Sequence, residues 1–309
     1  MILEEGKMKR PTEEELIKYN VNYKRDTDFA AHARLLQSKW RVQKKLEMNN
    51  EIRSNYGNFI ETESAKKKKS NYITENIKTL VVEKVNEIKK QGGLVGEPRI
   101  WNNLLSSQPL CFNLFGELYY NLELASKLFI KLFPVKVDKV TKIDFEYSSK
   151  RNEPDNSAFD VYVEYELNGI QKFFGIEVKY QESLKEETKV KAQQNFEKHK
   201  EKYVELSTNS GFFKPNALKN ISRPPFAQIW RDHLLSFNMS SSKRDGSFVY
   251  LYPFQNDECK KSVNDYKKFL VDGDESKFYP VDLDNCIRTL NEIHPCKWTN
   301  ELVERYLGN

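Results

Sequence analysis

The sequence predicts an α/β (α+β) fold in which a central β-sheet is flanked by helices, with further helices toward both ends of the chain. Three observations predict it. Apolar residues recur at helical spacing before residue 90, they alternate at a spacing of two between residues 143 and 180, and helical spacing then returns before a last short strand. The chain has 309 residues, of which 39% are hydrophobic and 31% charged, as in a soluble globular protein with a large core.

Two amphipathic helices are expected in an N-terminal helical region, residues 1–95, packed on the rest of the chain. The first begins near Asp28 and repeats apolar residues at roughly helical spacing: Phe29, Ala33, Leu36, Trp40 and Val42. The second has one apolar stripe: Ile77, Leu80, Val81, Val85 and Ile88. The Gly92-Gly93 pair ends it.

Residues 96–309 are expected to form one domain with its core at about residues 112–254. The stretch from Phe112 is apolar on nearly all sides, which indicates a helix packed in the core. One narrow stripe of this helix is polar: Asn113, Glu117 and Asn121. A first strand follows, because apolar residues then alternate with charged ones: Ile143, Phe145 and Tyr147 with Lys142, Asp144 and Glu146. Lys150–Ser157 is predicted to be a loop.

Two further strands are the most informative part of the sequence. Phe159–Leu167 and Ile170–Tyr180 are joined by Asn168-Gly169, the pair most favoured in a two-residue type I′ turn. Such a turn makes Leu167 face Ile170 and fixes every other opposed pair of the antiparallel ladder. The first strand then gathers its apolar side chains on one face: Phe159, Val161, Val163, Tyr165 and Leu167. A slip by one residue would turn this apolar set outward, which supports the register.

The same register places Asp160 directly opposite Glu177, with Cβ atoms about 5 Å apart. Lys179 lies two residues further and shares the face of Glu177. Opposed carboxylates repel, and a hard divalent cation such as Mg²⁺ compensates them because it prefers oxygen ligands. The lysine could then orient or activate a cation-bound water as a nucleophile that attacks a phosphate. The alternative is an ordinary amphipathic hairpin with Lys179 in a surface ion pair worth under about 1 kcal/mol.

The remaining segments complete the order helix, three strands, helix, strand. The charged stretch Lys185–Glu205 is expected to contain a helix exposed on one side. A firmer helix runs from about Phe226 to Met239, with apolar residues turned inward: Phe226, Ile229, Trp230, Leu234 and Phe237. Its outward residues are polar: Gln228, Arg231 and Asp232. Ser247–Phe254 is predicted to be a short strand, and the residues after it peripheral helices and turns.

These residues resemble the PD-(D/E)XK nuclease superfamily, in which Asp160, sixteen further residues and Glu177-Val178-Lys179 match the motif. Four segments are similar to a bacterial group of restriction endonucleases: LLSSQPLCFNLFGEL, SAFDVYVEY, FFGIEVKY and FAQIWRDHLL. The resemblance covers roughly residues 29–254. It implies a restriction-endonuclease-like core with a central mixed sheet of about four or five strands. The chain departs from the motif in having Phe159, not proline, before Asp160.

The resemblance also implies roles for particular residues. Asp160 and Glu177 would bind Mg²⁺, for which Mn²⁺ substitutes, the Val178 carbonyl would add a ligand, and Lys179 would position the attacking water. Glu117 corresponds to an acidic residue that completes the metal site or orients a metal-bound water, or it is a helix-surface carboxylate without a role. Gln228 and Arg231 would face the metal or the scissile phosphate, or make structural contacts. His233 and Trp230 are interpreted as packing residues.

Composition excludes other classes of protein. No run of about 18 apolar residues occurs, so a membrane or exported protein is not expected. The four cysteines form no CxxC pair, which favours reduced thiols in a cytoplasm, with a weak alternative of a metal at His294 and Cys296. The four histidines form no HNH-like or HxH cluster, which other nuclease chemistries would require. No GxxxxGK[ST] loop is present, so the chain has no ATP-driven motor of its own.

The sequence therefore predicts a cytoplasmic Mg²⁺-dependent endodeoxyribonuclease of restriction or phage-defence type that acts on double-stranded DNA. A DNA repair or recombination nuclease and a non-catalytic nucleic-acid-binding protein are the alternatives. A homodimer and a cognate methyltransferase or other defence-system partner fit this role. The net charge of +5 decides nothing alone. Basic residues near the N-terminus could contact DNA or form a solvated cap: Arg34, Lys39, Arg41, Lys44, Lys45 and the run Lys66–Lys69.

Overall fold

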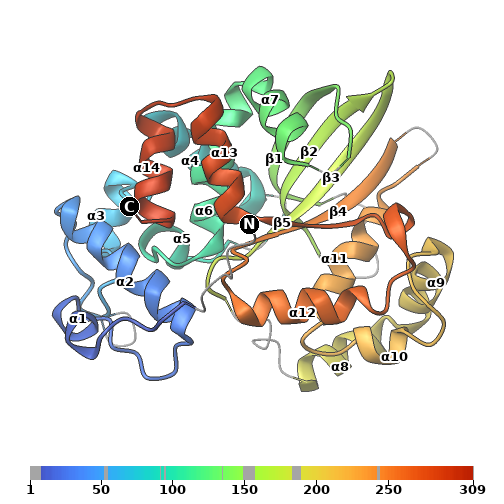
Figure 1. The fold of residues 1–309 in the computed structure, drawn as a ribbon, viewed down its shortest axis with the longest axis horizontal. Coiled ribbons are helices and arrows are strands. Elements are labelled where there is room, and N and C mark those ends of the chain that lie inside the picture. The colour runs from blue at the N-terminus through green and yellow to red at the C-terminus, as the bar shows by residue number, and fades with distance from the viewer. Residues whose placement is uncertain are drawn as a thin grey trace, which may run out of the picture.

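The computed structural model describes residues 8–51, 55–90, 92–93, 95–133, 135–148, 157–182, 189–241 and 244–308 (Figure 1). Its strands are β1 Lys139–Tyr147, β2 Phe159–Leu167, β3 Ile170–Val178, β4 Arg244–Tyr252 and β5 Phe278–Asp282. Helices before the sheet are α1 Glu13–Lys18, α2 Asp28–Gln43, α3 Thr62–Lys68, α4 Glu75–Lys90, α5 Arg99–Asn102, α6 Ser107–Tyr120 and α7 Leu122–Leu132. Later helices are α8 Lys189–Lys198, α9 Lys200–Ser210, α10 Leu218–Ile221, α11 Ala227–Asn238, α12 Asp257–Lys267, α13 Leu283–Ile293 and α14 Lys297–Tyr306, with a 3₁₀ turn η1 at Gly273–Ser276.

The five strands form one mixed sheet in the order β1-β2-β3-β4-β5. The first three strands are antiparallel, whereas β3, β4 and β5 run parallel. This arrangement confirms the predicted fold class. The prediction of only helices and turns after Phe254 is wrong, because β5 lies there. This edge strand has five residues and contains Pro280, so it shows too short an alternation to be recognised in the sequence.

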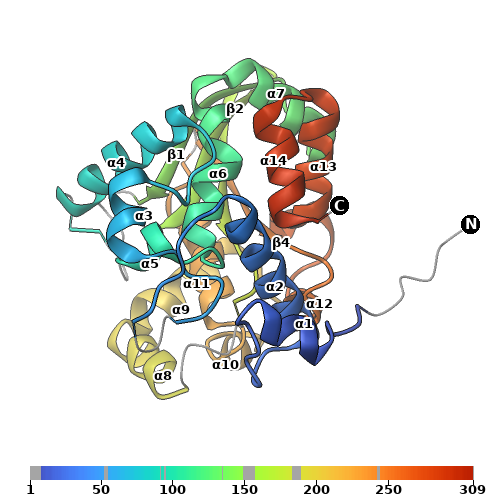
Figure 2. The ribbon, with the colours of Figure 1, turned by 90° about the vertical axis from the view of Figure 1, so that its left-hand side faces the viewer.

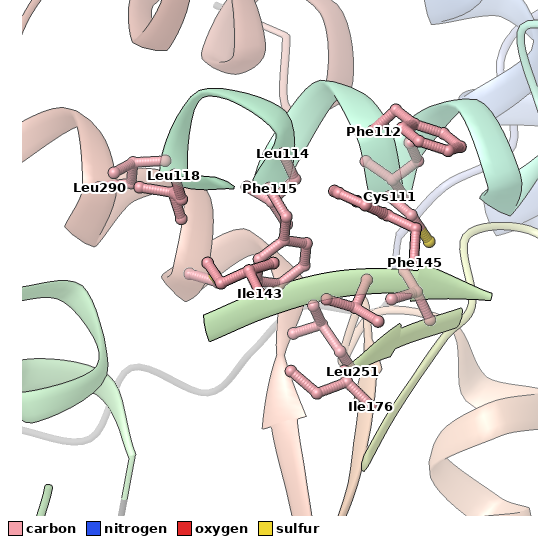
Figure 3. Close-up of a cluster of buried hydrophobic side chains, with 14 of the residues drawn as sticks. Cys111, Phe112, Leu114, Phe115, Leu118, Ile143, Phe145, Ile176, Leu251 and Leu290 are labelled. Carbon is pink, nitrogen blue, oxygen red and sulfur yellow. The ribbon is translucent and has the colours of Figure 1, made fainter. Parts of the chain in front are cut away.

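Helices cover both faces of the sheet (Figure 1). The larger apolar core joins α4, α6, α7, α13 and α14 to one face. In Figure 3, side chains of α6 lie over Ile143 and Phe145 of β1, with Ile176 of β3 and Leu251 of β4 beneath them. A second core joins α9, α11 and α12 to the other face. The five residues predicted for the stripe of α4 are all buried.

The predicted core helix is interrupted at Asn121, where α6 ends and α7 begins. The Asn121 side chain accepts a hydrogen bond from the Leu124 amide at 3.0 Å and so caps α7. Asn113 is fully buried and bonds the Asn71 carbonyl and the Tyr306 hydroxyl, both at 3.0 Å. Two residues of the polar stripe therefore have structural roles.

The hairpin has the predicted register. Asn168 and Gly169 have φ values of 51° and 74°, as a type I′ turn requires, and Leu167 pairs with Ile170. The pairing continues to Val161 and Ile176. β3 ends at Val178, two residues before the predicted end.

The predicted place of Phe159 is wrong, because its ring packs in the second core, not beside Val161. Its ring centroid lies 6.5 Å from those of Phe173 and Phe248. Gly175 leaves room for this ring, since a Cβ there would lie 2.2 Å from the Phe159 Cζ. The regular alternation of side chains is therefore lost at the first residues of β2.

The N-terminal and C-terminal helices pack together, and Figure 2 shows α2 beside α14. Arg34 is paired with Asp26 at 2.6 Å, and the buried Arg41 donates to the Gly57 carbonyl at 2.8 Å. These two arginines thus belong to a cap over the core. Among the described residues, every helix is too short or too polar to cross a lipid bilayer.

The second half of the chain departs from expectation in two places. The predicted charged helix is divided into α8 and α9 at His199, and Asp232, expected on the outside of α11, is buried. Most of the predicted loop, residues 150–156, and residues 185–188 of the charged stretch lie outside the described residues.

Candidate active site

Asp160 and Glu177 lie where β2 begins and β3 ends. They are the next opposed positions after Val161 and Ile176 in the observed register. Asp160 Oδ2 accepts a hydrogen bond from the Val178 amide at 2.8 Å, so its carboxylate takes the place of a ladder acceptor at this end of the strand pair. The structure thus brings together the two carboxylates that the hairpin predicts.

Glu177, Lys179 and Gln228 form a closed polar network. Lys179 Nζ lies 2.7 Å from Glu177 Oε1 and donates to Gln228 Oε1 at 3.1 Å. Gln228 Nε2 in turn donates to Glu177 Oε1 at 2.6 Å. Glu177 is only 4% exposed, so removing Lys179 would leave its buried charge uncompensated. Because Gln228 comes from α11, the second core helix helps to hold the Glu177 and Lys179 side chains in place.

The surroundings raise the pKa values of both Asp160 and Lys179. Burial, then the negative charges of Glu177 and Glu146, raise the pKa of Asp160 well above its usual value. Burial alone would lower the pKa of Lys179, but Glu177 and Asp160 outweigh it and raise that pKa. The site therefore holds more negative charge than its lysine compensates.

Glu146 is a further acid at the site that sequence reasoning assigned only to the polar face of β1. It stands between the pairs Phe145–Val161 and Tyr147–Phe159, opposite Asp160. Burial raises the pKa of Glu146 to about 7, and the charge of Glu177 adds to this, against a hydrogen bond from Gln108 that lowers it. Its place depends on how β1 pairs with β2, and the eleven residues between these strands are too many for the sequence to set that pairing.

Glu117 does not lie at the site, which corrects its predicted role. Its carboxylate accepts hydrogen bonds from the Thr74 hydroxyl and from Asn76 Nδ2, at the start of α4. Gln108, which contacts Glu146, lies nine residues earlier on α6, about 13 Å along the helix axis. The turn of α6 that carries Glu117 is therefore too far along the helix to reach the carboxylates.

The other predicted residues divide between site and core. Gln228 lies in the site, and Arg231 is partly exposed three residues further along α11, which places it toward the same side of the helix. Trp230 donates to Ser207 Oγ at 3.3 Å, and the buried His233 lies 3.0 Å from the Tyr266 hydroxyl and 2.7 Å from the Ser276 carbonyl. These two residues pack, as predicted.

The donor set suits a hard divalent cation. Hydrogen bonds between described residues engage Oδ2 of Asp160 and Oε1 of Glu177, which leaves the second oxygen of each carboxylate for a ligand. In the described part of the chain, no three side chains of His, Cys, Asp or Glu converge as a ready metal site. Two carboxylates with backbone and water oxygens would meet the preference of Mg²⁺ for few protein ligands.

Comparison with known proteins agrees with this arrangement. The PD-(D/E)XK nuclease superfamily matches residues 24–308, which is nearly the whole chain. No curated protein and no solved structure matches. The matched region contains all five strands and the polar network at the ends of β2 and β3. With its mixed sheet and its Asp160, Glu177 and Lys179 in one place, the chain belongs to the PD-(D/E)XK nuclease superfamily.

Proposed function

We propose that this protein is a Mg²⁺-dependent endodeoxyribonuclease of restriction or phage-defence type that hydrolyses phosphodiester bonds of double-stranded DNA. The observation that carries the proposal is the juxtaposition of Asp160 with Glu177, whose carboxylate is itself paired with Lys179 at 2.7 Å. An ion pair that only stabilises the surface does not need three features found here. These are the burial of Glu177, the repelling carboxylate of Asp160 beside it, and Gln228, which bonds both Glu177 and Lys179. A site for chemistry on a charged substrate accounts for all three.

The second oxygens of Asp160 and Glu177 would hold the cation, and the Val178 carbonyl would add a ligand. Mn²⁺ would substitute because it accepts the same oxygen ligands. When bound, the cation lowers the pKa of a water and stabilises negative charge on the scissile phosphate.

The chain's own residues would position the reacting groups. The Lys179 ammonium stays charged beside two carboxylates and can donate a hydrogen bond to the attacking water or to a phosphate oxygen. Gln228 holds the lysine and Glu177 in one arrangement, as a positioning residue. Arg231 would bind a phosphate through its planar guanidinium group.

A basic surface on α3 would contact the DNA backbone. Lys66, Lys67 and Lys68 are exposed in the last turn of α3, and none of their ammonium groups lies in an ion pair with a described residue. The positive charge of Lys66 acts on Glu97. The neighbouring Gly96 amide donates to Gln108 Oε1 at 3.1 Å, and Gln108 donates to Glu146 at the site. These contacts lead from the C-terminal end of α3 through Gln108 to Glu146, and we propose that phosphates flanking the scissile bond pass along this side.

Plasmid and linear DNA incubated with Mg²⁺ or with EDTA would test the proposal. We expect cutting that requires Mg²⁺ and is lost in Asp160→Ala and Lys179→Ala. Lys200→Ala is a matched control, because Lys200 pairs with Glu197 on the surface outside the sheet. Cutting that survives both site substitutions would overturn the site, and binding without any cutting would favour a non-catalytic module.

The products would separate the remaining roles. Discrete fragments would support a restriction-type enzyme, whereas a smear would favour a repair or recombination nuclease. A homodimer would cut both strands together, and a cognate methyltransferase or other defence partner would protect the host DNA in the cytoplasm. These partners stay predictions of the sequence.

A further inference from the structure

Three acidic residues occupy neighbouring positions across three adjacent strands. The pairs Phe145–Val161 and Tyr147–Phe159 place Glu146 of β1 across from Asp160 of β2. The β2–β3 register, continued by one pair beyond Val161–Ile176, places Asp160 across from Glu177. Neighbouring strands lie about 4.8 Å apart, so Asp160 stands between the other two acids.

A side chain of α6 holds Glu146 in place, on the other side of the site from Lys179. Gln108 Nε2 donates to Glu146 Oε1 at 2.5 Å, and Gln108 Oε1 is itself fixed by the Gly96 amide. Among the described residues, hydrogen bonds engage only this oxygen of Glu146. Its backbone has a φ of 46°, which glutamate rarely adopts, so its side chain does not follow the regular strand. The carboxylate is therefore fixed in direction and keeps one oxygen for a further partner.

We propose that Glu146 is the third carboxylate of the cation site, supplied by β1 in place of the predicted Glu117. This inference rests on the proposed function. Because the described carboxylates do not converge as three direct ligands, Glu146 would accept hydrogen bonds from water ligands of a cation held by Asp160 and Glu177. It would thus be a positioning residue that strengthens cation binding and orients the water facing β1.

The alternative is that Glu146 serves only as an acceptor that anchors the start of α6 through Gln108. The two roles differ in their effect on the cation-free protein. A purely structural acceptor stabilises the fold, whereas a third carboxylate beside two others repels them until a cation is bound. Glu146→Gln keeps the side-chain shape and an acceptor oxygen for Gln108 but removes the charge.

Mg²⁺ binding to the full chain, measured by isothermal titration calorimetry, would test the proposal without relying on DNA cutting. Glu146→Gln should weaken Mg²⁺ binding by on the order of tenfold or more. Glu117→Gln is the matched control and should leave binding unchanged, because Glu117 bonds Thr74 and Asn76 instead. Asp160→Asn should abolish binding.

Urea denaturation without cation supplies the second measurement. At pH 8, Glu146→Gln should raise the midpoint because repulsion is relieved. Unchanged Mg²⁺ affinity in Glu146→Gln, within twofold of the wild type, would overturn the role of Glu146, and so would a lowered midpoint, which a purely structural acceptor predicts. Gln108→Ala keeps the charge of Glu146 but releases its side chain, so this variant should weaken Mg²⁺ binding less than Glu146→Gln does. Equal Mg²⁺ affinity in the wild type and both variants would also overturn the role of Glu146. Unchanged binding in Asp160→Asn would instead overturn the proposed active site.

Discussion

His233 shows how a single buried residue outside the candidate active site couples the stability of the fold to pH. Its ring stacks on Phe212 with centroids 4.6 Å apart and contacts the Ser276 carbonyl. Burial lowers its pKa from 6.5 to about 3, against a smaller effect of the Ser276 hydrogen bond. Between these pH values the unfolded chain binds a proton that the folded protein excludes. The contribution of His233 is therefore complete above pH 6.5 and is lost as the pH falls toward 3.

Because of His233, we expect the free energy of unfolding to fall by about 1.4 kcal/mol for each unit by which the pH is lowered from 6.5 to 3. His233→Phe should remove that part of the slope, although it costs stability at neutral pH because Tyr266 and the Ser276 carbonyl lose their partner. Urea denaturation at several pH values measures it. The exposed His294→Asn serves as control. Equal slopes in His233→Phe and the wild type would contradict the assignment.

Single residues differ in how well the sequence predicts their place, for a physical reason. Asp160, Glu177 and Lys179 were predictable because a two-residue turn relates their strands. Glu117 was predicted at the site because it lies on a core helix, but α6 runs past the site and its third turn faces α4. Glu146 was missed because eleven residues separate β1 from β2, and a connection of that length does not set a register.

Elements with strong local signals were predicted correctly, whereas those marked by a single capping residue or by contacts distant in the sequence were not. The stripe of α4 and the Asn168-Gly169 hairpin follow from local spacing and turn chemistry. The division at Asn121 follows from a side-chain cap within an otherwise apolar stretch. β5 is stabilised as a strand mainly by its pairing with β4, and five residues alone do not indicate that pairing.

Helix α3 ends in a turn whose three lysines have two possible roles. Positive charge at a helix C-terminus stabilises it by about 0.3–1 kcal/mol for each residue. The lysines would also release counterions from DNA if they contact phosphates. The triple variant Lys66→Gln/Lys67→Gln/Lys68→Gln distinguishes these roles, because only the second makes DNA binding depend on them.

We expect this triple variant to bind duplex DNA more weakly and to lower the slope of log Kd against log salt by about 2 to 3. Fluorescence anisotropy at several salt concentrations, without divalent cation, measures both effects. Lys127→Gln/Lys131→Gln/Lys136→Gln is the control with the same change in charge, at the end of the sheet away from the site. An equal loss of affinity in both triple variants would mean that only net charge matters.

Contacts between α2, near the N-terminus, and α14, the last helix, join the two ends of the chain to the core. Arg305 of α14 is fully buried and lies 4.2 Å from the ring centroid of Trp40 on α2. Its guanidinium group donates to Gln37 Oε1 at 3.0 Å and to the Asn71 carbonyl and side chain at 2.7 and 2.6 Å. Asn71 in turn accepts from Asn113 of α6. One arginine therefore connects α2, the segment before α4, and the helix that covers the sheet.

Arg305→Met should destabilise the protein by about 3 kcal/mol or more, because several buried acceptors lose a charged donor. The matched control is Arg288→Ala, which removes an exposed arginine from the adjacent helix α13 and should change stability by less than about 0.5 kcal/mol. Urea denaturation measures the loss, and hydrogen exchange locates it. Since the contacts link the three parts, exchange should increase together in α2, α6 and α14. An increase confined to α14 would show that the C-terminal helix unfolds without the core, and that Arg305 does not join the ends of the chain to the nuclease fold.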